Sequence, residues 1–587
     1  MRNPRVVLLL AVSLLASSIA FAEEAETHFL REAVGVKSYA AAPRIVARMQ
    51  VEPAATLSAA AGAIPDQLEA LRSWNAEGRQ PARNGLIRSL GETMAVRFGG
   101  VAVKSGLNGR GVVVATSRGT TWGTSLRVEN AQRLRLHLEN VELPAGTTLW
   151  VYGRSGEAVP FDTSLMDEKK GLWTPSVNGD TLYLEIEVPA GTSGSFDAKE
   201  VLELLYGRGA NFRSKSDDAP TCLPGQDATC QTAAEFPGLA AARAAVGQME
   251  FVVGNGGAVC SGTLINDQRG SGTPLFLTAN HCIAEQTAAS SLQTYFDFAF
   301  ESCVSSNSGY LPAVSGATLL TTSGTTDVTL LRLPSLPSNR AFLGWTNTPP
   351  TNGTALHRIS HPVPDGSPEA LPQMYSRTIV KSTGTTCPSL QRPNFIYSNE
   401  TNGGEGGVYG GSSGSSALLA DAKIVGQLQG SCGPDPAAGC DRRNDTVDGA
   451  FSQSFSVLSS FLTSSGTTPQ PCVANSSTIC LVNNRFSVRV TYDVGNGHQP
   501  MTAIKYTPDT GLFWFDQATN IEILLKMINA CSFNQRFWVF VGGTTDVGVG
   551  ITVTDTTNGT VKTYSNPRGS KFQTITASGN DAFATCP

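Results

Sequence analysis

Charged residues are scarce in this sequence, and it has no excess of positive charge. Asp, Glu, Lys and Arg make up 16% of the 587 residues, and the formal net charge is -5. Nucleic-acid-binding proteins usually carry a basic patch, so the composition gives no support for a nucleic-acid partner. The hydrophobic fraction of 41% and the many Gly, Ser and Thr residues favour two to four β-rich extracellular domains over a helical cytosolic enzyme.

Long apolar segments are missing as well. No stretch reaches about 18 uninterrupted apolar residues, the length of a membrane-spanning helix, so we expect no membrane anchor. Residues 1–22 have the pattern of a secretory signal peptide, with Arg2 and Arg5, an apolar stretch over 6–16, and a small-residue cleavage site at 20–22. We therefore expect secretion to the extracellular space.

Cysteine is absent before Cys222, although 12 occur in the whole chain. In a secreted protein these residues are expected to form disulfides, and the Cys-free block marks a domain boundary. Ser464–Pro471 has the composition of a linker. We divide the chain into a signal peptide (1–22), an N-terminal region (23–215), a central domain (216–463), a linker (464–471) and a C-terminal domain (472–587).

Alternating apolar and polar residues predict strands in all three domains, and helices are predicted around 64–74 and 451–462. The predicted strands lie at 134–143, 148–153, 181–188, 258–265, 423–428, 485–492, 537–541 and 550–554. They indicate an antiparallel β domain, then a barrel or sandwich, then a β-sandwich. The first of these domains is either a permanent module or, as we favour from its lack of Cys, a pro-region that is removed after secretion.

Three short motifs carry the chemistry. His281 follows the apolar stretch Phe276–Ala279, Asp327 begins another apolar stretch, and Ser413 lies in a loop of Gly and Ser over 410–416. Small side chains around Ser413 would let backbone N–H groups approach a reacting carbonyl. Each motif alone is a weak signal. The order His, Asp, Ser is that of the chymotrypsin-type catalytic triad.

The same motifs resemble those of secreted bacterial lysyl endopeptidases. The loop reads Gly-Ser-Ser-Gly-Ser over 411–415, and in that family too a Ser precedes the nucleophile. The other matches are Phe-Leu-Thr-Ala-x-His-Cys at 276–282, Thr-Leu-Leu at 329–331 and Gly-Gln-Leu at 426–428. The likeness covers about residues 222–462. It implies a mostly β chain, with a chymotrypsin-like double β-barrel flanked by an N-terminal β pro-domain and a C-terminal β-sandwich.

The resemblance implies a secreted serine endopeptidase that cleaves protein or peptide substrates, with Lys or Arg before the cut. Ser413 is then the nucleophile, His281 the general base and Asp327 the residue that orients it. The N–H groups of Gly411 and Ser413 would form the oxyanion hole. We expect no cofactor, no metal and a monomer. The alternative is a non-catalytic binding or adhesion protein on a protease-like scaffold, against which the complete triad argues.

Activation is expected to differ from that of trypsin. Ser412 stands where trypsin has the Asp that pairs with a newly formed N-terminus, and no Ile-Val-Gly-Gly start occurs near residue 216. Removal of the pro-region must therefore act in another way, for instance by uncovering the cleft, which makes the pro-region a partner of the protease. The basic, polar segment Arg213–Ser216 is the predicted processing site.

The resemblance also implies disulfides. Cys260 is expected to pair with Cys282, Cys230 with Cys303, and Cys222 with Cys432 or Cys440. This leaves Cys387 and the remaining Cys of that last pair, whose connectivity the sequence does not settle. The C-terminal domain can close its own bridges with Cys472, Cys480, Cys531 and Cys586.

The match is weakest at the specificity pocket. Gln429 stands where lysyl endopeptidases have a His, and no Trp between 345 and 514 could form an aromatic pocket wall. An acidic residue would be needed to pair with a substrate Lys. The candidate substrate-binding residues are Gln429, Gly430, Asp445 and Asp448.

The other histidines are not predicted to bind metal. His357 and His361 have the spacing of ligands on a helix, but Pro362 and the turn-forming residues after it favour a loop. No His-Glu-x-x-His motif is present, so we expect no zinc site. His137 and His498 are predicted to lie on the surface of strands or loops.

Overall fold

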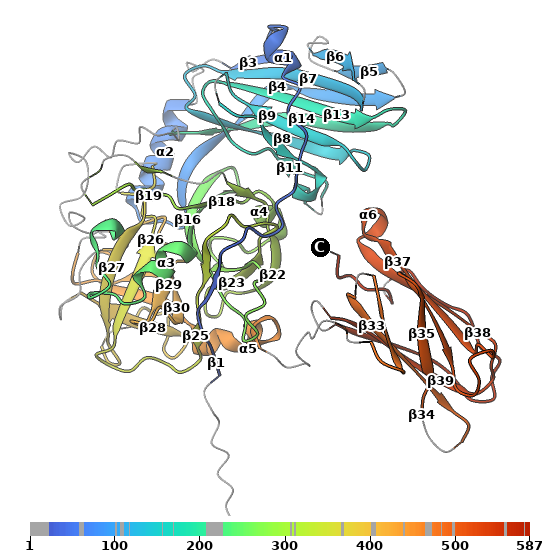
Figure 1. Cartoon of the computed structure of the whole chain (residues 1–587). Helices are drawn as coiled ribbons and strands as arrows, with labels where there is room; N and C mark the ends of the chain where they lie inside the picture. The colour runs from blue at the N-terminus through green and yellow to red at the C-terminus, as the bar shows by residue number, and fades with distance from the viewer. Residues whose placement is uncertain are drawn as a thin grey trace, which may run out of the picture. The chain divides into compact units, whose positions relative to one another are not determined.

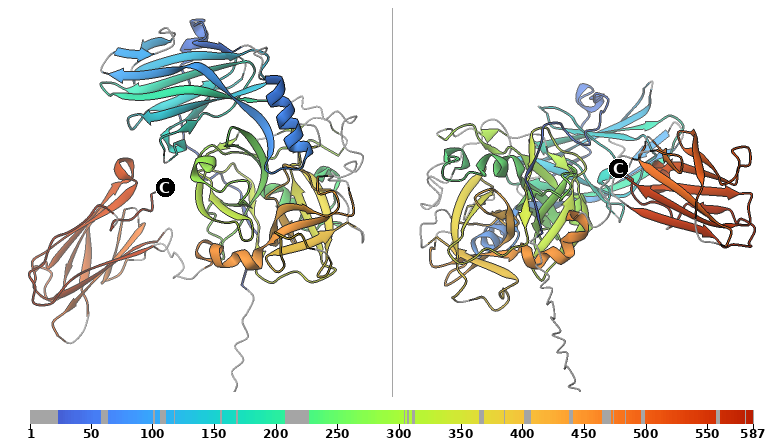
Figure 2. Two further views of the ribbon diagram at one scale, coloured as in Figure 1. Left: turned by 180° about the vertical axis from the view of Figure 1, so that it is seen from behind. Right: turned by 60° about the horizontal axis from the view of Figure 1, so that its bottom comes forward.

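The computed structural model divides the chain into two compact units, residues 1–462 and 463–587 (Figures 1 and 2). The described residues are 23–57, 64–99, 102–105, 111–116, 118–154, 156–167, 169–206, 227–303, 305, 308–309, 313–364, 369–384, 386–400, 407–437, 441–463, 472, 474–482, 484–495, 499–556, 560–579 and 581–586.

The N-terminal region is built from two layers of mostly antiparallel strands around a hydrophobic core (blue to cyan in Figure 1). One layer has the order β10-β9-β13-β7-β3 with β6 on β7, where the strands are β3 (Ala55–Leu57), β6 (Val112–Ala115), β7 (Gly119–Val128), β9 (Thr148–Tyr152), β10 (Val159–Phe161) and β13 (Thr181–Pro189). The other contains β4 (Ala82–Gly99), β5 (Ala102–Ser105), β8 (Arg133–Glu142), β11 (Leu172–Trp173), β12 (Val177–Asn178) and β14 (Gly194–Leu204). Leu134, Leu136 and Leu138 alternate into the core, as the sequence pattern of β8 predicts.

The first half of the central domain is a curved sheet that curls back on itself. Its strand order is β22-β23-β17-β16-β15-β18-β21. The two end strands are separated by only two residues of chain, so the sheet nearly closes into a barrel. The bounds are β15 (Val246–Val253), β16 (Gly256–Leu264), β17 (Leu275–Ala279), β18 (Gln293–Phe296), β21 (Val314–Ser315), β22 (Thr318–Ser323) and β23 (Val328–Arg332).

The second half is a closed ring of six strands. The order β26-β27-β28-β31-β30-β29 returns to β26, which leaves no free edge in the ring. Two barrels in one domain are the chymotrypsin-like architecture, so the predicted fold class is confirmed. The bounds are β26 (Ala355–Ser360), β27 (Met374–Val380), β28 (Phe395–Asn399), β29 (Ser416–Leu418), β30 (Ile424–Cys432) and β31 (Asp445–Ala450).

The N-terminal region adds strands to the central domain at three places. Two short pieces, β1 (Glu24–Ala25) and β2 (His28–Leu30), pair with β25 (Trp345–Thr346) and β24 (Arg340–Phe342). The first residues of β4 pair with β16 of the central domain, and the strand also pairs with β14 of the N-terminal region. One long strand therefore belongs to both regions (Figure 1). Arg133 of β8 also forms a buried ion pair with Glu250 of β15. The two regions therefore share backbone hydrogen bonds and a buried charge pair.

The remaining elements of the first unit are short, apart from two helices that the sequence predicted. They are α1 (Ile45–Arg48), α2 (Ile64–Ala76), α3 (Leu239–Ala245), α4 (Gln286–Ser290), α5 (Phe451–Leu462), the 3₁₀ turns η1 (Thr163–Leu165) and η2 (Ala228–Cys230), and the paired strands β19 (Ala299–Phe300) and β20 (Ser308–Gly309). No helix in the described part of the chain is long and apolar enough to span a bilayer.

Three disulfides are described in the central domain. Cys260–Cys282 and Cys230–Cys303 form as predicted. Cys432 bonds to Cys387, so of the two partners expected for Cys222, Cys432 and Cys440, the first is excluded. The fold packs Cys387 against Cys432 in a small apolar cluster at the end of β30, although the two residues are distant in sequence. Cys222 and Cys440 lie outside the described residues.

The C-terminal unit is a β-sandwich of two five-stranded sheets around one core. One sheet contains β32 (Thr478–Leu481), β33 (Phe486–Asp493), β34 (Gln499–Pro500), β39 (Gly548–Asp555) and β40 (Val561–Asn566). The other contains β35 (Thr502–Thr507), β36 (Thr510–Trp514), β37 (Ile523–Ala530), β38 (Arg536–Gly543) and β41 (Ile575–Ala577), with α6 (Cys531–Asn534) before β38. The unit closes two bridges of its own, Cys472–Cys480 and Cys531–Cys586.

His357 is part of the core rather than of a loop, which corrects the sequence interpretation. It lies in β26, its ring stacks on Phe236 with centroids 4.4 Å apart, and Nδ1 is 2.8 Å from the hydroxyl of Tyr375. Burial, reinforced by the positive charge of Arg377, lowers the pKa of His357 from 6.5 to about 4. The imidazole is therefore neutral in the folded protein at neutral pH.

This depressed pKa predicts a loss of stability in acid. The neutral imidazole stabilises the fold fully above its unfolded pKa of about 6.5, and that contribution is lost as the pH falls toward and through about 4. Calorimetry from pH 7 to pH 4 should show a falling Tm, and His357→Gln should remove about 1–3 kcal/mol of that pH dependence. An identical decline in the variant would show that His357 does not cause it.

Candidate active site

The ends of two neighbouring strands place His281 beside Asp327. β17 ends at Ala279 and β23 begins at Val328, and these two residues are paired across the strands. The residues just beyond them must therefore lie next to each other. Asp327 has a positive φ of 55°, which turns the chain sharply before β23 begins. The apolar stretches read from the sequence thus position both side chains.

Asp327 holds His281 with both oxygens of its carboxylate. Nδ1 of His281 is 2.7 Å from Oδ2 of Asp327, and the backbone N–H of His281 donates to Oδ1 over 2.8 Å. The side chain of Gln427 donates to the carbonyl of Thr326 over 2.8 Å and fixes the backbone behind the carboxylate. An imidazole whose Nδ1–H points at a carboxylate keeps Nε2 free to accept a proton. Nε2 of His281 is buried and has no hydrogen-bond partner among the described residues.

Two glycines shape the loop that carries Ser413. Gly411 and Gly414 have φ angles of +86° and +82°, which side chains disfavour. A Cβ on Gly414 would lie 2.2 Å from Oγ1 of Thr278 and 2.9 Å from the nitrogen of Ala279. The loop is therefore pressed against the end of β17, the strand that leads into His281. The Ser413 motif and the His281 motif, far apart in sequence, meet at this contact.

β16 anchors the same loop from a second side. The N–H of Ser261 donates to the carbonyl of Ser413 over 2.8 Å, and its hydroxyl donates to the carbonyl of Gly411 over 2.9 Å. The N–H of Gly414 donates to the carbonyl of Leu428 over 2.9 Å. No backbone acceptor among the described residues takes the N–H of Gly411 or of Ser413. These are the two donors that the sequence predicts for an oxyanion hole.

Ser412 and a buried ion pair brace the loop from behind. Ser412 is fully buried, and its hydroxyl accepts a hydrogen bond from Ser360 over 3.0 Å. Arg358 donates to the carbonyl and the hydroxyl of Ser415 over 2.7 and 3.1 Å. The same guanidinium donates to Asp448 over 2.6 Å. Two residues that were not singled out from the sequence, Arg358 and Ser360, therefore contact the Ser413 loop directly.

A cavity of about 340 Å³ opens beside Ser413. Gln429 and Gly430, both predicted to bind substrate, lie in its wall. Tyr409 also lines it, so the wall contains an aromatic residue although no Trp is available. The described wall is uncharged and consists of Asn75, Gly78, Gln80, Cys387, Ser389, Leu390, Val408, Tyr409, Gly410, Ser413, Leu428, Gln429, Gly430, Ser431, Pro436 and Ala437.

The two acidic candidates lie elsewhere. Asp445 accepts from Lys381 over 2.8 Å and from Asn399 over 3.0 Å. Asp448 is fully buried against Arg358; burial raises its pKa, and the guanidinium opposes that rise. Neither Asp445 nor Asp448 is among the residues that line the cavity beside Ser413. The structure therefore does not bring them to the position expected for partners of a substrate Lys.

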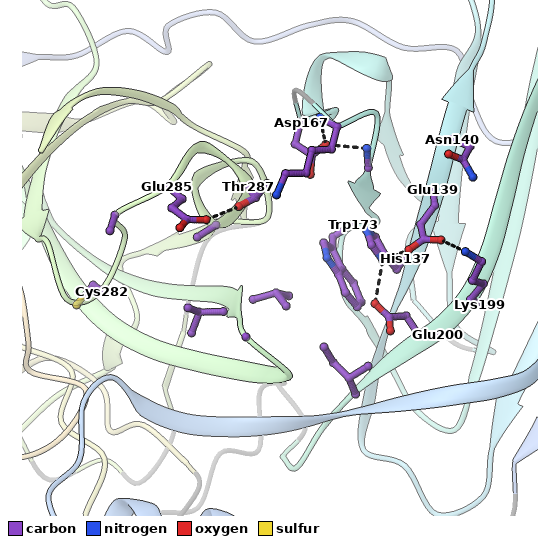
Figure 3. A pocket seen from close by; sticks show the side chains of 18 of the residues that line it. His137, Glu139, Asn140, Asp167, Trp173, Lys199, Glu200, Cys282, Glu285 and Thr287 are labelled. Carbon is purple, nitrogen blue, oxygen red and sulfur yellow. Dashed lines mark hydrogen bonds and ion pairs between the residues drawn. The ribbon is translucent and has the colours of Figure 1, made fainter.

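A larger cavity, of about 800 Å³, has His281 in its wall and lies between the central domain and the N-terminal region (Figure 3). Its wall includes His137, which stacks on Trp173 with ring centroids 4.4 Å apart and bonds to Glu200 over 2.9 Å. His137 lies on a strand, as expected, but faces this cavity. His498 lies outside the described residues.

His281 also lies close to two sulfur atoms, those of Cys260 and Cys282. These atoms are bonded to each other at 2.00 Å, so neither is a thiolate that could bind a metal ion. The grouping is a disulfide that ties β16 to the residue after His281. The disulfide therefore links β16, which anchors the Ser413 loop, to the segment that carries His281.

Comparison of the sequence with known proteins finds two matching family models and a similar curated protein. A family model described as lysyl endopeptidase, C-terminal domain, matches residues 217–448, and one described as lysyl endopeptidase N-terminal domain matches residues 115–196. A lysyl endopeptidase of Pseudomonas aeruginosa is 28% identical over 340 residues, which cover 54% of this chain and 70% of that protein.

Among solved structures, the scabies mite inactivated protease paralogue S-I1 shares 14% identity and covers 38% of this chain and 94% of its own, with a TM-score of 0.28. The MamO protease domain from Magnetospirillum magneticum shares 14% identity and covers 37% of this chain and 96% of its own, with a TM-score of 0.24. The two family models together with the curated relative identify the chain as a lysyl endopeptidase-like protein.

Proposed function

We propose that this peptidase is a secreted serine endopeptidase whose triad is Ser413, His281 and Asp327. The observation that carries the proposal is the pair of hydrogen bonds from His281 to the carboxylate of Asp327, which leaves Nε2 as a proton acceptor. The Ser413 loop packs against the strand that leads to this histidine. Acyl transfer by a serine requires a nucleophile, a base and a carboxylate that orients the base.

In the proposed reaction Oγ of Ser413 attacks the substrate carbonyl carbon, and Nε2 of His281 takes the hydroxyl proton. The same proton then passes from His281 to the departing amine, which leaves an acyl-enzyme. A water molecule attacks the acyl-enzyme in the same way and releases the carboxylic acid. Negative charge on the carbonyl oxygen is stabilised by the N–H groups of Gly411 and Ser413, each worth about 10²–10³ in rate. Asp327 stabilises the imidazolium that forms in between.

For specificity we propose Lys, or Arg, before the cut, as the printed name of the relative suggests. In this chain an ammonium group entering the cavity beside Ser413 would meet the backbone carbonyl of Gln429 and the polar side chains of the wall. It would not meet Asp445 or Asp448, since their carboxylates are engaged by Lys381 and Arg358. Recognition would then depend on several hydrogen bonds rather than one salt bridge.

We further propose that residues 1–22 direct secretion and that 23–215 form a pro-region. The support for the second proposal is the way the N-terminal region shares strands with the central domain through β1, β2 and β4. A region so placed covers part of the protease surface and has to leave before large substrates can bind. The C-terminal β-sandwich is proposed as a separate module that takes no part in the chemistry.

Removal of the nucleophile or the base tests the triad. Ser413→Ala and His281→Ala should each lower kcat by about 10⁶-fold with little change in KM, because the residues act as one unit. Steady-state kinetics and labelling of Ser413 with a fluorophosphonate provide the measurement. Retention of a tenth of the activity in either variant would refute the triad assignment, whereas an unlabelled Ser413 in the processed protein would favour the binding-protein alternative.

Arg358 is predicted to position the nucleophile loop. Lys at this site keeps the charge but cannot bridge Ser415 and Asp448 with one planar group. Arg358→Lys should therefore lower kcat by about 10–100-fold while KM stays nearly constant. The matched control is Arg340→Lys, which disturbs the ion pair of an equally buried Arg with Asp297. It should lower Tm without changing kcat, and an equal fall in kcat in both variants would mean that Arg358 acts only through stability.

Maturation is predicted to occur by self-cleavage within Arg213–Ser216, after Lys215, a segment outside the described residues. The Ser413→Ala protein should accumulate with residues 23–215 attached, and active enzyme added in trans should cut it. N-terminal sequencing should find a start between Ser214 and Asp217, with some variation, because Ser412 offers no carboxylate for the new N-terminus. Normal maturation of the Ala variant in a protease-free host would contradict this account.

A further inference from the structure

A segment of the N-terminal region runs directly past Ser413. Ala82 and Arg83, at the start of β4, pair with Val259 and Ala258 of β16. Two residues further along β16, Ser261 bonds to the carbonyl of Ser413. The chain just before β4 therefore enters the sheet edge next to the nucleophile. Addition of an extended strand to a sheet edge is one of the usual ways in which proteins bind peptides.

The side chain of Gln80 lines the same cavity as Ser413. Its Nε2 donates to the carbonyl of Gln429 over 2.7 Å, and a Cβ on Gly430 would lie 2.5 Å from the same nitrogen. Ala82 follows in an apolar site made with Val259, Val363 and Ala370, where it is 1% exposed. Side chains of the segment thus fill successive sites along the cleft, as those of a bound peptide do.

We infer that residues 80–83 are a built-in substrate mimic that keeps the enzyme latent. The inference rests on the proposed function. Gln80 takes the place of the substrate residue before the cut, and Pro81 and Ala82 take the places of the residues after it. The bond between Gln80 and Pro81 is the one presented to Ser413. The ligand class that this cleft accepts is an extended peptide running in the direction of β4.

The helix before the segment explains why the mimic is not consumed. Nε1 of Trp74 donates to the carbonyl of Pro81 over 2.9 Å. Asn75 at the end of α2 donates to the carbonyl of Arg83 over 2.9 Å and accepts from its N–H over 2.8 Å. The side chain of Asn75 thus bonds to Arg83 as a neighbouring strand would. The residues after the presented bond are held from the side opposite to β16.

We call the hydrogen bonds of Trp74 to Pro81 and of Asn75 to Arg83 the clamp, and this clamp acts on the leaving group. If Oγ of Ser413 attacked the carbonyl carbon of Gln80, His281 would pass the hydroxyl proton to the nitrogen of Pro81 as the C–N bond broke. The amine would stay in place, because Trp74 and Asn75 hold the residues attached to it. An amine held next to the acyl-enzyme attacks it at a high effective concentration and restores the original bond. Hydrolysis by water is therefore suppressed.

Cleavage at 213–216 alone would leave the mimic in the cleft. The pairing of β4 with β16 and the buried pair of Arg133 with Glu250 do not involve that segment. The cut pro-region would therefore remain bound as a non-covalent inhibitor until it is released or degraded. Processing and activation are then two separable events.

The test loosens the clamp in the full-length chain. In N75A/P81A the side chain of Asn75 no longer holds Arg83, and the presented bond no longer leads into a proline ring, so the mimic should become a substrate although Trp74 still contacts residue 81. Mass spectrometry of the purified protein should show a cut between positions 80 and 81, and a fluorophosphonate should label Ser413 at least tenfold faster than in the unprocessed wild type. The same substitutions combined with S413A should give no cut. The matched control is Glu77→Gln, an exposed side chain of the same segment, which should behave as wild type.

The outcomes separate the mimic from the proposed function. If N75A/P81A stays uncut and labels at the wild-type rate while processed wild type labels normally, the mimic is wrong and the protease stands. If processed wild type does not label, the proposed function itself fails. Should N75A/P81A not fold, Gln80→Ala decides, because loss of its side chain should speed labelling of the unprocessed chain at least threefold. An unchanged rate in that variant overturns the inference.

Discussion

The hydrogen bonds of one strand, β16, hold the functional parts of this molecule together. β16 pairs with β15, with β17 and with β4 of the N-terminal region. Cys260 in this strand is bonded to the residue after His281, and the next residue, Ser261, holds the Ser413 loop with its N–H and its hydroxyl. The strand is almost wholly buried, and a shift of its register by one residue would exchange its two faces. The site therefore depends on this register more than on any single catalytic side chain.

The buried charges behind the site have a different origin from those of trypsin. There, an ion pair forms at the nucleophile loop when a new N-terminus is released. Here, Arg358 and Asp448 form an ion pair within the folded chain, and Ser412 is satisfied by the hydroxyl of Ser360. Removing two charges from water is costly, and the hydrogen bond of the guanidinium to the loop offsets part of that cost. The loop is thus braced before any peptide bond is cut, so the proposed latency of the full chain does not depend on a disordered loop.

The sequence allowed the fold and part of the site to be predicted, for a physical reason. His281 and Asp327 directly flank apolar strands, and strand periodicity depends on local sequence alone. The Cys260–Cys282 bond was implied by the resemblance to lysyl endopeptidases. The Cys387–Cys432 bond, the Arg358–Asp448 pair and the placement of His357 in the core are contacts between segments distant in sequence. No local pattern encodes them. Asp445 and Asp448 looked available for substrate because their buried partners, Lys381 and Arg358, are more than 60 residues away.

The lack of Cys in the N-terminal region agrees with its attachment by non-covalent contacts alone. A disulfide between the regions would persist after the chain is cut in an oxidising compartment, and the cleft could then never open. Backbone pairing through β4 and the contact of Arg133 with Glu250 are strong while the two regions are one chain, because the linkage keeps their effective concentration high. A cut between them removes this advantage and leaves an equilibrium that dilution or digestion of the released region can shift. A region meant to inhibit first and depart later is therefore expected to rely on strands and ion pairs and to contain no cysteine.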